Sequence, residues 1–447
     1  MRIIVAGAGA GKTTSMAEEV LNRYEKIKDG KIIYVITYTN AARDHIRKKI
    51  IELHGSIPKQ IKVETSHVFL LQEIIFPFNY LLYGQLYTAT SIIPLPNKHN
   101  YRAYKLNELR EQNTIHVEEV TKIAKYVLVG KSSDRKIIKE KRKKVLATIG
   151  RYLDSIFIDE VQDVDCYLSE IIRVLHKNDF YLHLVGDPKQ DLRGGNELRK
   201  LIEQYSQYVE YKRENYRCPI SHVNFSNQYV IEEERQDYQT TDLGTIDYLF
   251  ETEIDIYELI KTKSFNHMYI YQKNDRFFTS DKKKNEFYNL LKYELKRLVQ
   301  KSKYADDHIE KIIYILAKWI KKVINSVDDW EVINKLGVML SIELTIKDKA
   351  RMIDVLNLIR EREEMKGIQV DSIDKVKGLE GEKCLFILST ELADYFFKIK
   401  SDQNKMANYL YVALTRAKDE LTILITREVE IKYTKEWINK QLLVLLN

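Results

Sequence analysis

The chain has 447 residues, of which 44% are hydrophobic and 31% charged, and its formal net charge is +7. Only 16 Gly and 6 Pro occur beside 30 Tyr, which excludes collagen-like, Gly/Ser-linker and Pro-rich disordered classes. No stretch approaches the roughly 18 uninterrupted apolar residues of a membrane span, and Met1–Ala6 lacks the apolar core of a secretory signal. Three widely spaced cysteines predict neither a zinc site nor disulfides and favour a cytoplasmic protein. Because no apolar stretch is long enough to span a membrane, no membrane partner is expected.

Short apolar, β-prone runs recur along the chain, and each precedes a polar or Gly-bearing turn. In the first half these runs are Arg2–Val5, Ile32–Thr37, Ile61–Thr65, Ser155–Ile158 and Tyr181–Val185. In the second half they are Ile246–Phe250, Met268–Tyr271, Ile368–Ile373, Cys384–Leu388 and Leu421–Thr426. Runs of this kind are typical of parallel strands that are buried on both faces. The pattern predicts two α/β units with a boundary near 210–240.

Two long segments are instead expected to be helical, Lys-rich insertions. We predict a first domain over residues 1–215 with an insertion at about 75–150, and a second over 216–447 with an insertion at about 280–365. Charge runs in these segments, such as Arg142-Lys143-Lys144, are more typical of a solvated helix face than of a binding patch.

A glycine-rich run follows the first expected strand and opens a helix. It reads Ala6-Gly7-Ala8-Gly9-Ala10-Gly11-Lys12-Thr13 and matches the Walker A pattern. Small residues let backbone N–H groups close around phosphate oxygens, and the helix presents its N-terminus to negative charge. Lys12 is expected to reach the β- and γ-phosphates, and Thr13 to bind Mg²⁺. The predicted nucleotide-binding residues of this loop are Gly7, Ala8, Gly9, Ala10, Gly11, Lys12, Thr13 and Thr14.

Two further strands end in chemically suggestive residues. The strand over Ser155–Ile158 runs directly into the acidic segment DEVQD. In it, Asp159 suits the magnesium ion and Glu160 suits the polarisation of an attacking water. The next strand ends in GDPKQ, whose Gln190 is placed to reach a γ-phosphate or the catalytic water.

Six segments then follow one another in a specific order: AGAGAGKTT, DEVQD, GDPKQ, Asn215-Tyr216-Arg217, VKGLEG from Val376, and YVALTRAK from Tyr411. In kind and order they resemble the motifs of the UvrD/Rep-like superfamily I DNA helicases, and they span nearly the whole chain. The resemblance implies an α/β fold of two RecA-like P-loop domains with parallel sheets and small helical insertions. ATP and Mg²⁺ would then lie in the cleft between the domains.

The resemblance also implies roles for residues of the second half. Arg217 and Arg416 match the two arginines that contact the γ-phosphate, where positive charge stabilises phosphoryl transfer. Tyr216 matches the aromatic residue that stacks on the base, and Glu380 matches the carboxylate on the ribose side. With Glu160 and Gln190, the two arginines make up the expected catalytic set.

Weaker similarities mark a DNA-binding side. Tyr38 and Thr39 lie in a segment similar to the family's TFTN motif, whose aromatic residue stacks on a base. Thr65 and His67 lie in a segment similar to its TxH motif, which contacts the DNA backbone. For His67, a packed or capping role is equally expected.

The chain also departs from the family. The upstream glutamine motif that reads adenine is not expected before the first strand. After Gln190 the sequence continues Asp191-Leu192-Arg193-Gly194-Gly195 and lacks the family's DNA-stacking aromatic residue. A full-sized accessory domain does not fit between Arg217 and Val376.

Three hypotheses follow. The first is an ATP-dependent helicase or translocase, with 3′→5′ polarity expected by resemblance, acting on single-stranded or partly unwound DNA. The second is a nucleotide-gated regulatory ATPase subunit that signals the state of DNA to a partner nuclease, as implied by compact family members such as the helicase-like subunit of the Gabija antiphage system. The third is a binding module without hydrolysis, which the complete catalytic set argues against.

Overall fold

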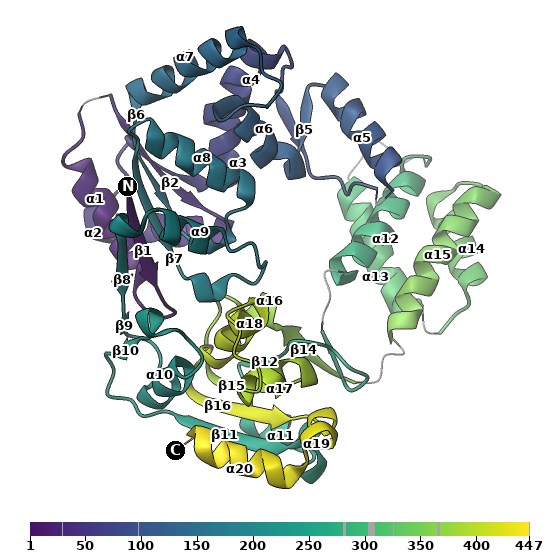
Figure 1. Ribbon diagram of the computed structural model, residues 1–447. Coiled ribbons are helices and arrows are strands. Elements are labelled where there is room, and N and C mark those ends of the chain that lie inside the picture. Colours follow the sequence, from purple (N-terminus) through teal and green to yellow (C-terminus); the bar gives the residue numbers. More distant parts are fainter. Residues whose placement is uncertain are drawn as a thin grey trace. The chain divides into compact units, whose positions relative to one another are not determined.

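The computed structural model describes residues 1–28, 30–96, 98–279, 283–302, 309–324, 326–363 and 367–446. The fold is α/β and contains two six-stranded sheets (Figure 1). The chain divides into two compact units. The larger unit comprises Met1–Asn266 and Lys377–Asn447, and the smaller one comprises His267–Val376. No helix within the described ranges combines the length and apolar composition that a membrane crossing requires.

The first sheet lies in the larger unit, and its neighbouring strands are parallel. Its strand order is β3 (Ile61–Thr65), β2 (Ile32–Thr37), β6 (Leu153–Ile158), β7 (Tyr181–Gly186), β1 (Arg2–Ala6) and β8 (Val209–Lys212). The first five strands in this order are those expected from the sequence. The prediction missed β8, because its exposed Glu210 and Tyr211 break the apolar run at the edge of the sheet.

Both faces of this sheet are covered, since alternate residues of a strand point to opposite sides. Ile4 and Ile33 belong to a core that includes residues of α1 (Lys12–Tyr24) and α2 (Asn40–His54). Their neighbours Ile3 and Tyr34 belong to a core that includes residues of α6 (Val120–Leu128), α7 (Lys136–Tyr152) and α8 (Cys166–Lys177). Because the strands are parallel, the loops that follow β1, β2, β3, β6 and β7 all leave the same edge of the sheet.

The remaining elements of the first part are mostly helical. They are α3 (Ser66–Phe69), the π-helix η1 (Leu70–Ile75), α4 (Phe76–Tyr83), β4 (Ala89–Ser91), α5 (His99–Glu111), β5 (Thr114–His116), η2 (Val117–Glu119), η3 (Val161–Asp163), η4 (Pro188–Gln190), α9 (Glu197–Gln204) and η5 (Ser206–Tyr208). Between residues 75 and 150, α4 to α7 and the short parallel pair β4–β5 form the segment predicted as an insertion.

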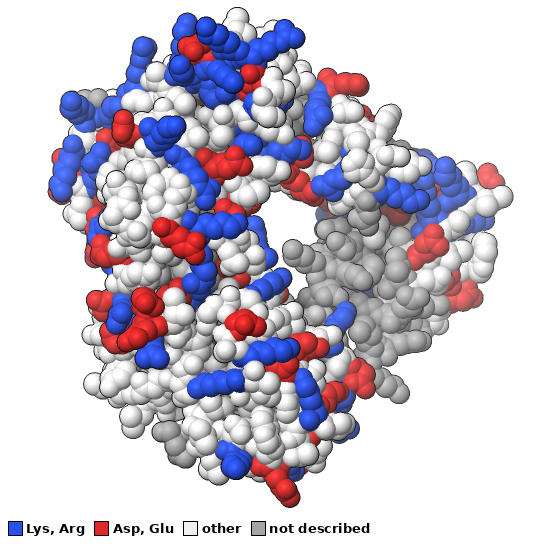
Figure 2. All heavy atoms as spheres, in the orientation of Figure 1, with Lys and Arg blue, Asp and Glu red and all other residues white. Residues whose placement is uncertain are grey.

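The charge run on α7 corrects one expectation. Lys143 and Lys144 are exposed, and Lys and Arg gather over α7 at the top of the face seen in Figure 2. Arg142 is not solvated, however: it is 7% exposed and forms an ion pair with Asp134. Its Nη2 also donates to the Tyr83 hydroxyl at 3.1 Å. The helix therefore turns Arg142 inward, where fixed acceptors compensate the loss of water.

In the larger unit, three strands of the second sheet pair in parallel in the order β11 (Thr245–Phe250), β16 (Ala417–Ile425) and β15 (Gly381–Leu388). Around them lie β9 (Glu214–Asn215), α10 (Ile220–Asn227), η6 (Glu232–Glu234), β10 (Asp237–Tyr238), η7 (Glu251–Glu253), α11 (Ile256–Lys263), α17 (Thr390–Phe396), α18 (Lys405–Leu414), α19 (Arg427–Tyr433) and α20 (Lys435–Leu446).

In the smaller unit, β12 (His267–Ile270), β14 (Ile368–Ser372) and β13 (Phe277–Thr279) pair in parallel. This unit also contains α12 (Lys283–Val299), α13 (Ile309–Val323), α14 (Asp329–Leu340), α15 (Ile346–Glu363) and α16 (Ile373–Val376). Helices α12 to α15 share a hydrophobic core of their own. The prediction missed β13, which has only three residues.

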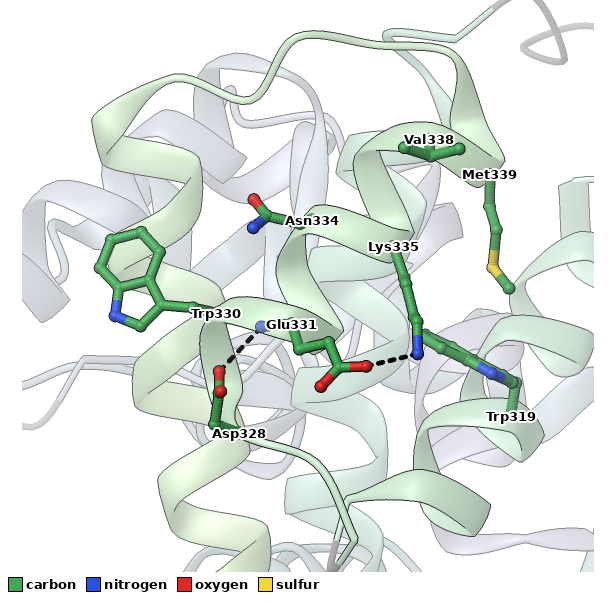
Figure 3. A pocket seen from close by; sticks show the side chains of 8 residues that line it. All are labelled: Trp319, Asp328, Trp330, Glu331, Asn334, Lys335, Val338 and Met339. Carbon is green, nitrogen blue, oxygen red and sulfur yellow. Dashed lines mark hydrogen bonds and ion pairs between the residues drawn. The ribbon is translucent and has the colours of Figure 1, made fainter.

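A cavity of about 640 Å³ lies on the helical part of the smaller unit (Figure 3). Its lining residues are Trp319, Asp328, Trp330, Glu331, Asn334, Lys335, Val338 and Met339. The lining contains none of the residues that the sequence predicts for nucleotide or DNA binding. The candidate site described below lies entirely in the larger unit.

Candidate functional site

The glycine-rich loop connects β1 to α1 and adopts a left-handed backbone at two positions. Gly9 has φ 76° and Gly11 has φ 68°, a conformation that residues with a Cβ adopt only at a cost. At Gly9 a Cβ would also lie 2.3 Å from Asn215 Oδ1, so the loop packs directly on the Asn215-Tyr216-Arg217 segment. Gly11 is the N-cap of α1, whose first-turn N–H groups have no partner within the helix. This is the geometry of a phosphate-binding turn.

Lys12 lies within this loop. Its Nζ donates to the carbonyl oxygens of Gly7 at 3.0 Å and Ala6 at 3.3 Å. Its positive charge opposes the rise in the pKa of Asp159 and helps to lower the pKa of Asp187, the residues that follow β6 and β7. The loop lysine and the two strand-end carboxylates therefore share one edge of the sheet.

The DEVQD segment places two adjacent carboxyl groups at this edge. Asp159 is 4% exposed, and its Oδ1 accepts from the Glu160 backbone N–H at 3.0 Å. Burial, together with the neighbouring Glu160 charge, raises the pKa of Asp159 to about 7. Glu160 has φ 54°, which turns the chain sharply at the end of the strand. The buried Asp159 carboxylate and its half-buried neighbour Glu160 are both oxygen ligands of the kind that a cation binds.

Glutamines connect this segment to the next strand. The Gln162 side chain donates to the Glu160 carboxylate, and its Oε1 accepts from the Asp187 backbone N–H at 2.9 Å. Gln190 is 5% exposed, and its Nε2 donates to Asp187 at 3.1 Å. Glu160 and Gln190 are thus joined through a continuous set of hydrogen bonds. Gln162 lies inside the DEVQD segment, but no separate role was predicted for it from the sequence.

Ion pairs connect the later motifs to one another and to the DEVQD segment. Arg217 Nε lies 2.6 Å from Glu380 Oε2, and Lys418 Nζ lies 3.0 Å from Glu380 Oε1. Burial acts to raise the pKa of Glu380, but Arg217 and Lys418 outweigh it and lower this pKa. Lys377 contacts both carboxylate oxygens of Asp163, at 2.7 and 2.8 Å. Three separate motifs, DEVQD, VKGLEG and YVALTRAK, therefore contact one another or common neighbours.

Tyr216 and Arg416 occupy contrasting environments. The Tyr216 backbone N–H donates to Gly9 O at 3.0 Å, while its side chain is 65% exposed beside the loop. Arg416 is 1% exposed. Its guanidinium donates to the carbonyl oxygens of Val412 at 2.9 Å and Leu379 at 3.1 Å. A contact of Arg416 with a phosphate therefore requires exchange of at least part of these hydrogen bonds.

The residues predicted for DNA binding lie at the same edge of the sheet: Tyr38 and Thr39 follow β2, Thr65 ends β3, and His67 follows β3. The hydroxyl of Thr39 caps α2 and accepts from Ala42 N at 3.1 Å, and the hydroxyl of Thr65 caps α3 and accepts from Val68 N at 3.4 Å. Both hydroxyls thus already satisfy helix N–H groups.

Tyr38 and His67 lie near the same charged side chains, Asp165 and Arg193. Tyr38 packs against the sheet core, and its buried hydroxyl has no hydrogen-bond partner within the described part of the chain. Burial raises the pKa of Tyr38 and lowers that of His67. His67 is therefore neutral near pH 7.

The loop after Gln190 closes on one carboxylate. Asp191 is 3% exposed and accepts from the backbone N–H groups of Arg193, Gly194 and Asn196 at 3.0, 2.8 and 2.7 Å. Asn408 of α18 donates to the Asp191 carbonyl oxygen at 3.0 Å. The segment in which the family's stacking aromatic residue is missing is thus a turn packed on α18.

A parallel sheet with a glycine-rich turn after β1 and paired carboxylates after β6 defines a P-loop nucleotide-binding protein. The AAA domain family AAA_19 matches residues 1–196. Gabija protein GajB from Bacillus cereus (strain VD045) is 24% identical over 496 residues, which cover 95% of this chain and 92% of GajB. Both similarities support the resemblance of the chain to the UvrD-like superfamily I helicases, a family of ATPases.

The chain also has similarity to a solved structure. It is a complex of arterivirus nonstructural protein 10, a helicase, with DNA. It aligns with a TM-score of 0.39 and 11% identity, covering 96% of this chain. The chain spans 61% of that viral protein.

Proposed function

We propose that the protein hydrolyses ATP with Mg²⁺ and uses the hydrolysis to act on single-stranded or partly unwound DNA, as a helicase or translocase. The observation that carries this proposal is the convergence of six motifs, spread from residue 6 to residue 418, around one edge of the first sheet. Hydrolysis by a P-loop protein needs positive charge, a positioned water and phosphate-binding amides in one place. The polarity expected from the family is 3′→5′, and the expected location is the cytoplasm.

The roles follow the chemistry of the side chains. Lys12 and the backbone from Gly7 to Thr14 bind the phosphates, and Tyr216 stacks on the base. Glu160 orients and deprotonates the attacking water, with Gln190 beside it. Arg217 and Arg416 supply charge to the transferred phosphoryl group. Glu380 is assigned to the ribose side, although in the present contacts it pairs with Arg217 at 2.6 Å, so ATP must compete for this arginine.

The donor set fits a magnesium ion. Mg²⁺ is held by hard oxygen ligands and usually keeps several waters and substrate phosphates in its shell. The Asp159 carboxylate and the Thr13 hydroxyl are such ligands. The pKa of Asp159 is raised to about 7 by burial and by Glu160, so this carboxylate gains from a nearby cation. The bound ion would neutralise charge on the phosphates.

A second candidate function is a nucleotide-gated regulatory ATPase that signals the state of DNA to a partner protein such as a nuclease. Its support is on the DNA side. The hydroxyls of Thr39 and Thr65 are engaged as helix caps, and the loop after Gln190 is closed on Asp191. The similarity to GajB over nearly the full length of both chains also supports it.

The test is ATPase activity measured in parallel with no nucleic acid, single-stranded DNA, tailed duplex and RNA. Phosphate contacts are strongest at low salt, so the assay is run at low and at moderate salt. Strong stimulation by single-stranded DNA supports the motor, and its absence at low salt overturns it. Unwinding of a tailed duplex by the isolated chain contradicts the regulatory alternative, whereas a stable complex with the product of a neighbouring gene supports it.

A further inference from the structure

Two buried side chains from the second half of the chain hold the phosphate loop near its start. Tyr411 lies on α18, and Gln236 immediately precedes β10. The Ala8 backbone N–H donates to the Tyr411 hydroxyl at 3.2 Å, and Gln236 Nε2 donates to the Ala8 carbonyl oxygen at 2.9 Å. Both polar groups of one loop residue are thus bound from outside the loop.

The two side chains also bind each other. The Tyr411 hydroxyl donates to Gln236 Oε1 at 3.0 Å, and Asn215 Nδ2 donates to the same oxygen at 3.2 Å. Gln236 is 4% exposed and Tyr411 is 2% exposed. Burial holds the pKa of Tyr411 well above its usual range, so its hydroxyl remains a donor. Hydrogen bonds in such a dry, fully paired cluster strengthen one another.

The absence of a side chain at Gly7 makes room for this contact. A Cβ at Gly7 would lie 2.4 Å from the carboxamide carbon of Gln236, so glycine at this position lets the glutamine approach the backbone. Ala8, Val230 and Tyr411 form a small apolar core beside it. The contact ends before the first turn of α1, whose N–H groups remain for phosphate oxygens.

Tyr411 also contacts the turn that carries Gln190. Lys189 Nζ lies 5.0 Å from the centre of the Tyr411 ring and 3.1 Å from an Asp187 carboxylate oxygen. The side chain of Lys189 is only 3% exposed. One phenol therefore touches both the phosphate loop and the turn after β7, the two segments predicted to flank the γ-phosphate.

We propose that Gln236 and Tyr411 are positioning residues for nucleotide binding, which hold the phosphate loop in its binding shape from the second half of the chain. The proposal rests on the proposed function, because it deepens the description of the same site. The alternative is a contact that only stabilises the fold. Under that alternative, loss of the hydrogen bonds lowers stability and leaves nucleotide affinity unchanged.

The experiment compares Tyr411→Phe and Gln236→Met with a matched control, Tyr34→Phe, in the full chain. The Tyr34 hydroxyl donates to Glu73 at 2.7 Å. Tyr34 lies on β2, a strand of the first sheet, and is 2% exposed. All three variants remove hydrogen bonds from buried side chains, but only the first two touch the loop. The measurements are the dissociation constant of a fluorescent ATP analogue, KM and kcat for ATP, and the melting temperature.

We expect about a fivefold weaker analogue affinity and a similar rise in KM for each loop variant, as loss of one net hydrogen bond implies. The Tyr34→Phe variant should melt lower but keep the affinity. If the loop variants melt lower but bind like Tyr34→Phe, the positioning role is wrong. If the unmodified chain does not bind the analogue, the proposed function fails instead. Should Tyr411→Phe not fold, Gln236→Met decides alone.

The double variant sharpens the result. Because the Tyr411 hydroxyl donates to Gln236, the two losses should not add. We expect the affinity of the double variant to resemble that of either single variant rather than to fall about 25-fold, the product of two fivefold losses. Full additivity would show that the two side chains act separately, and would contradict a joint role in positioning the phosphate loop.

Discussion

The residues predicted to bind nucleotide and those predicted to bind DNA lie at the same edge of the first sheet. Their polar side chains form different kinds of hydrogen bonds. On the nucleotide side, polar groups from distant segments meet: Gln162 links Glu160 to Asp187, and Tyr411 meets the phosphate loop. On the DNA side, Thr39 and Thr65 satisfy their own helices. The polar groups of the predicted nucleotide site are therefore already arranged around one another, whereas the predicted DNA contacts would require Thr39 and Thr65 to exchange partners.

The largest effect that tests the comparison is expected for Glu160→Gln. The variant should keep nucleotide binding and lose turnover by on the order of 100-fold or more, because a general base contributes that much. Single-turnover ATP hydrolysis and analogue binding measure the two steps. Glu203→Gln, an exposed glutamate on α9, is the control. Unchanged turnover in Glu160→Gln would show that the role assigned to this carboxylate is wrong.

The next effect concerns the ion pair that joins the two halves. Asp163 and Lys377 are each 17% exposed at the side chain and lie 2.7 Å apart. Removal of either partner leaves a mostly buried charge, so Asp163→Asn or Lys377→Met should lower the free energy of unfolding by about 2 kcal/mol. Denaturant titration measures this.

The control for that prediction is Lys143→Met. Lys143 pairs with Glu140 at 3.2 Å, but its side chain is 74% exposed, so the loss should stay within about 0.5 kcal/mol. Equal losses for Lys377→Met and Lys143→Met would mean that the inter-motif pair contributes no more than a surface pair.

On the DNA side, Tyr38 gives a smaller expected effect. Tyr38→Phe keeps the ring and removes a buried hydroxyl that lacks a partner among the described residues, so stability should be unchanged or rise by up to about 1 kcal/mol. Tyr38→Ala should weaken single-stranded DNA binding about tenfold if the ring stacks on a base. Fluorescence anisotropy with labelled DNA compares the two variants. Equal affinities would contradict the stacking role.

The smallest effect is expected from His67 and pH. Burial lowers the pKa of His67 below its usual value of 6.5, against a smaller opposing effect of Asp165. The neutral form therefore favours the fold above pH 6.5, and this contribution is lost as the pH falls below it. If His67 contacts a DNA phosphate, binding takes up a proton, and affinity should rise a few-fold from pH 7.5 to 6. The His67→Gln variant should lack the part of this rise in DNA affinity that comes from His67. Identical profiles of affinity against pH for the variant and the unmodified chain would exclude the contact.

The sequence predicted most of the fold, because strands buried on both faces leave an apolar run that is visible without an alignment. All ten expected strands are present, with ends shifted by at most a few residues, as for Ala417–Ile425 against the expected Leu421–Thr426. Elements that are short or half-solvated, such as Val209–Lys212 and Phe277–Thr279, have no such run and were missed. The inward turn of Arg142 was missed for a related reason, since a basic run does not show which of its members faces the core.

Local motifs also predicted the candidate site. A glycine-rich turn before a helix and adjacent carboxylates after a strand act through neighbouring atoms, so their pattern is contiguous in the sequence. How these motifs are held, by contrast, is visible only in the folded chain. Gln236 belongs to no motif and meets Ala8, 228 positions away, while Tyr411 meets the same residue from 403 positions away. Hydrogen bonds depend on distance in space, so partners so far apart along the chain come together only once the fold has formed.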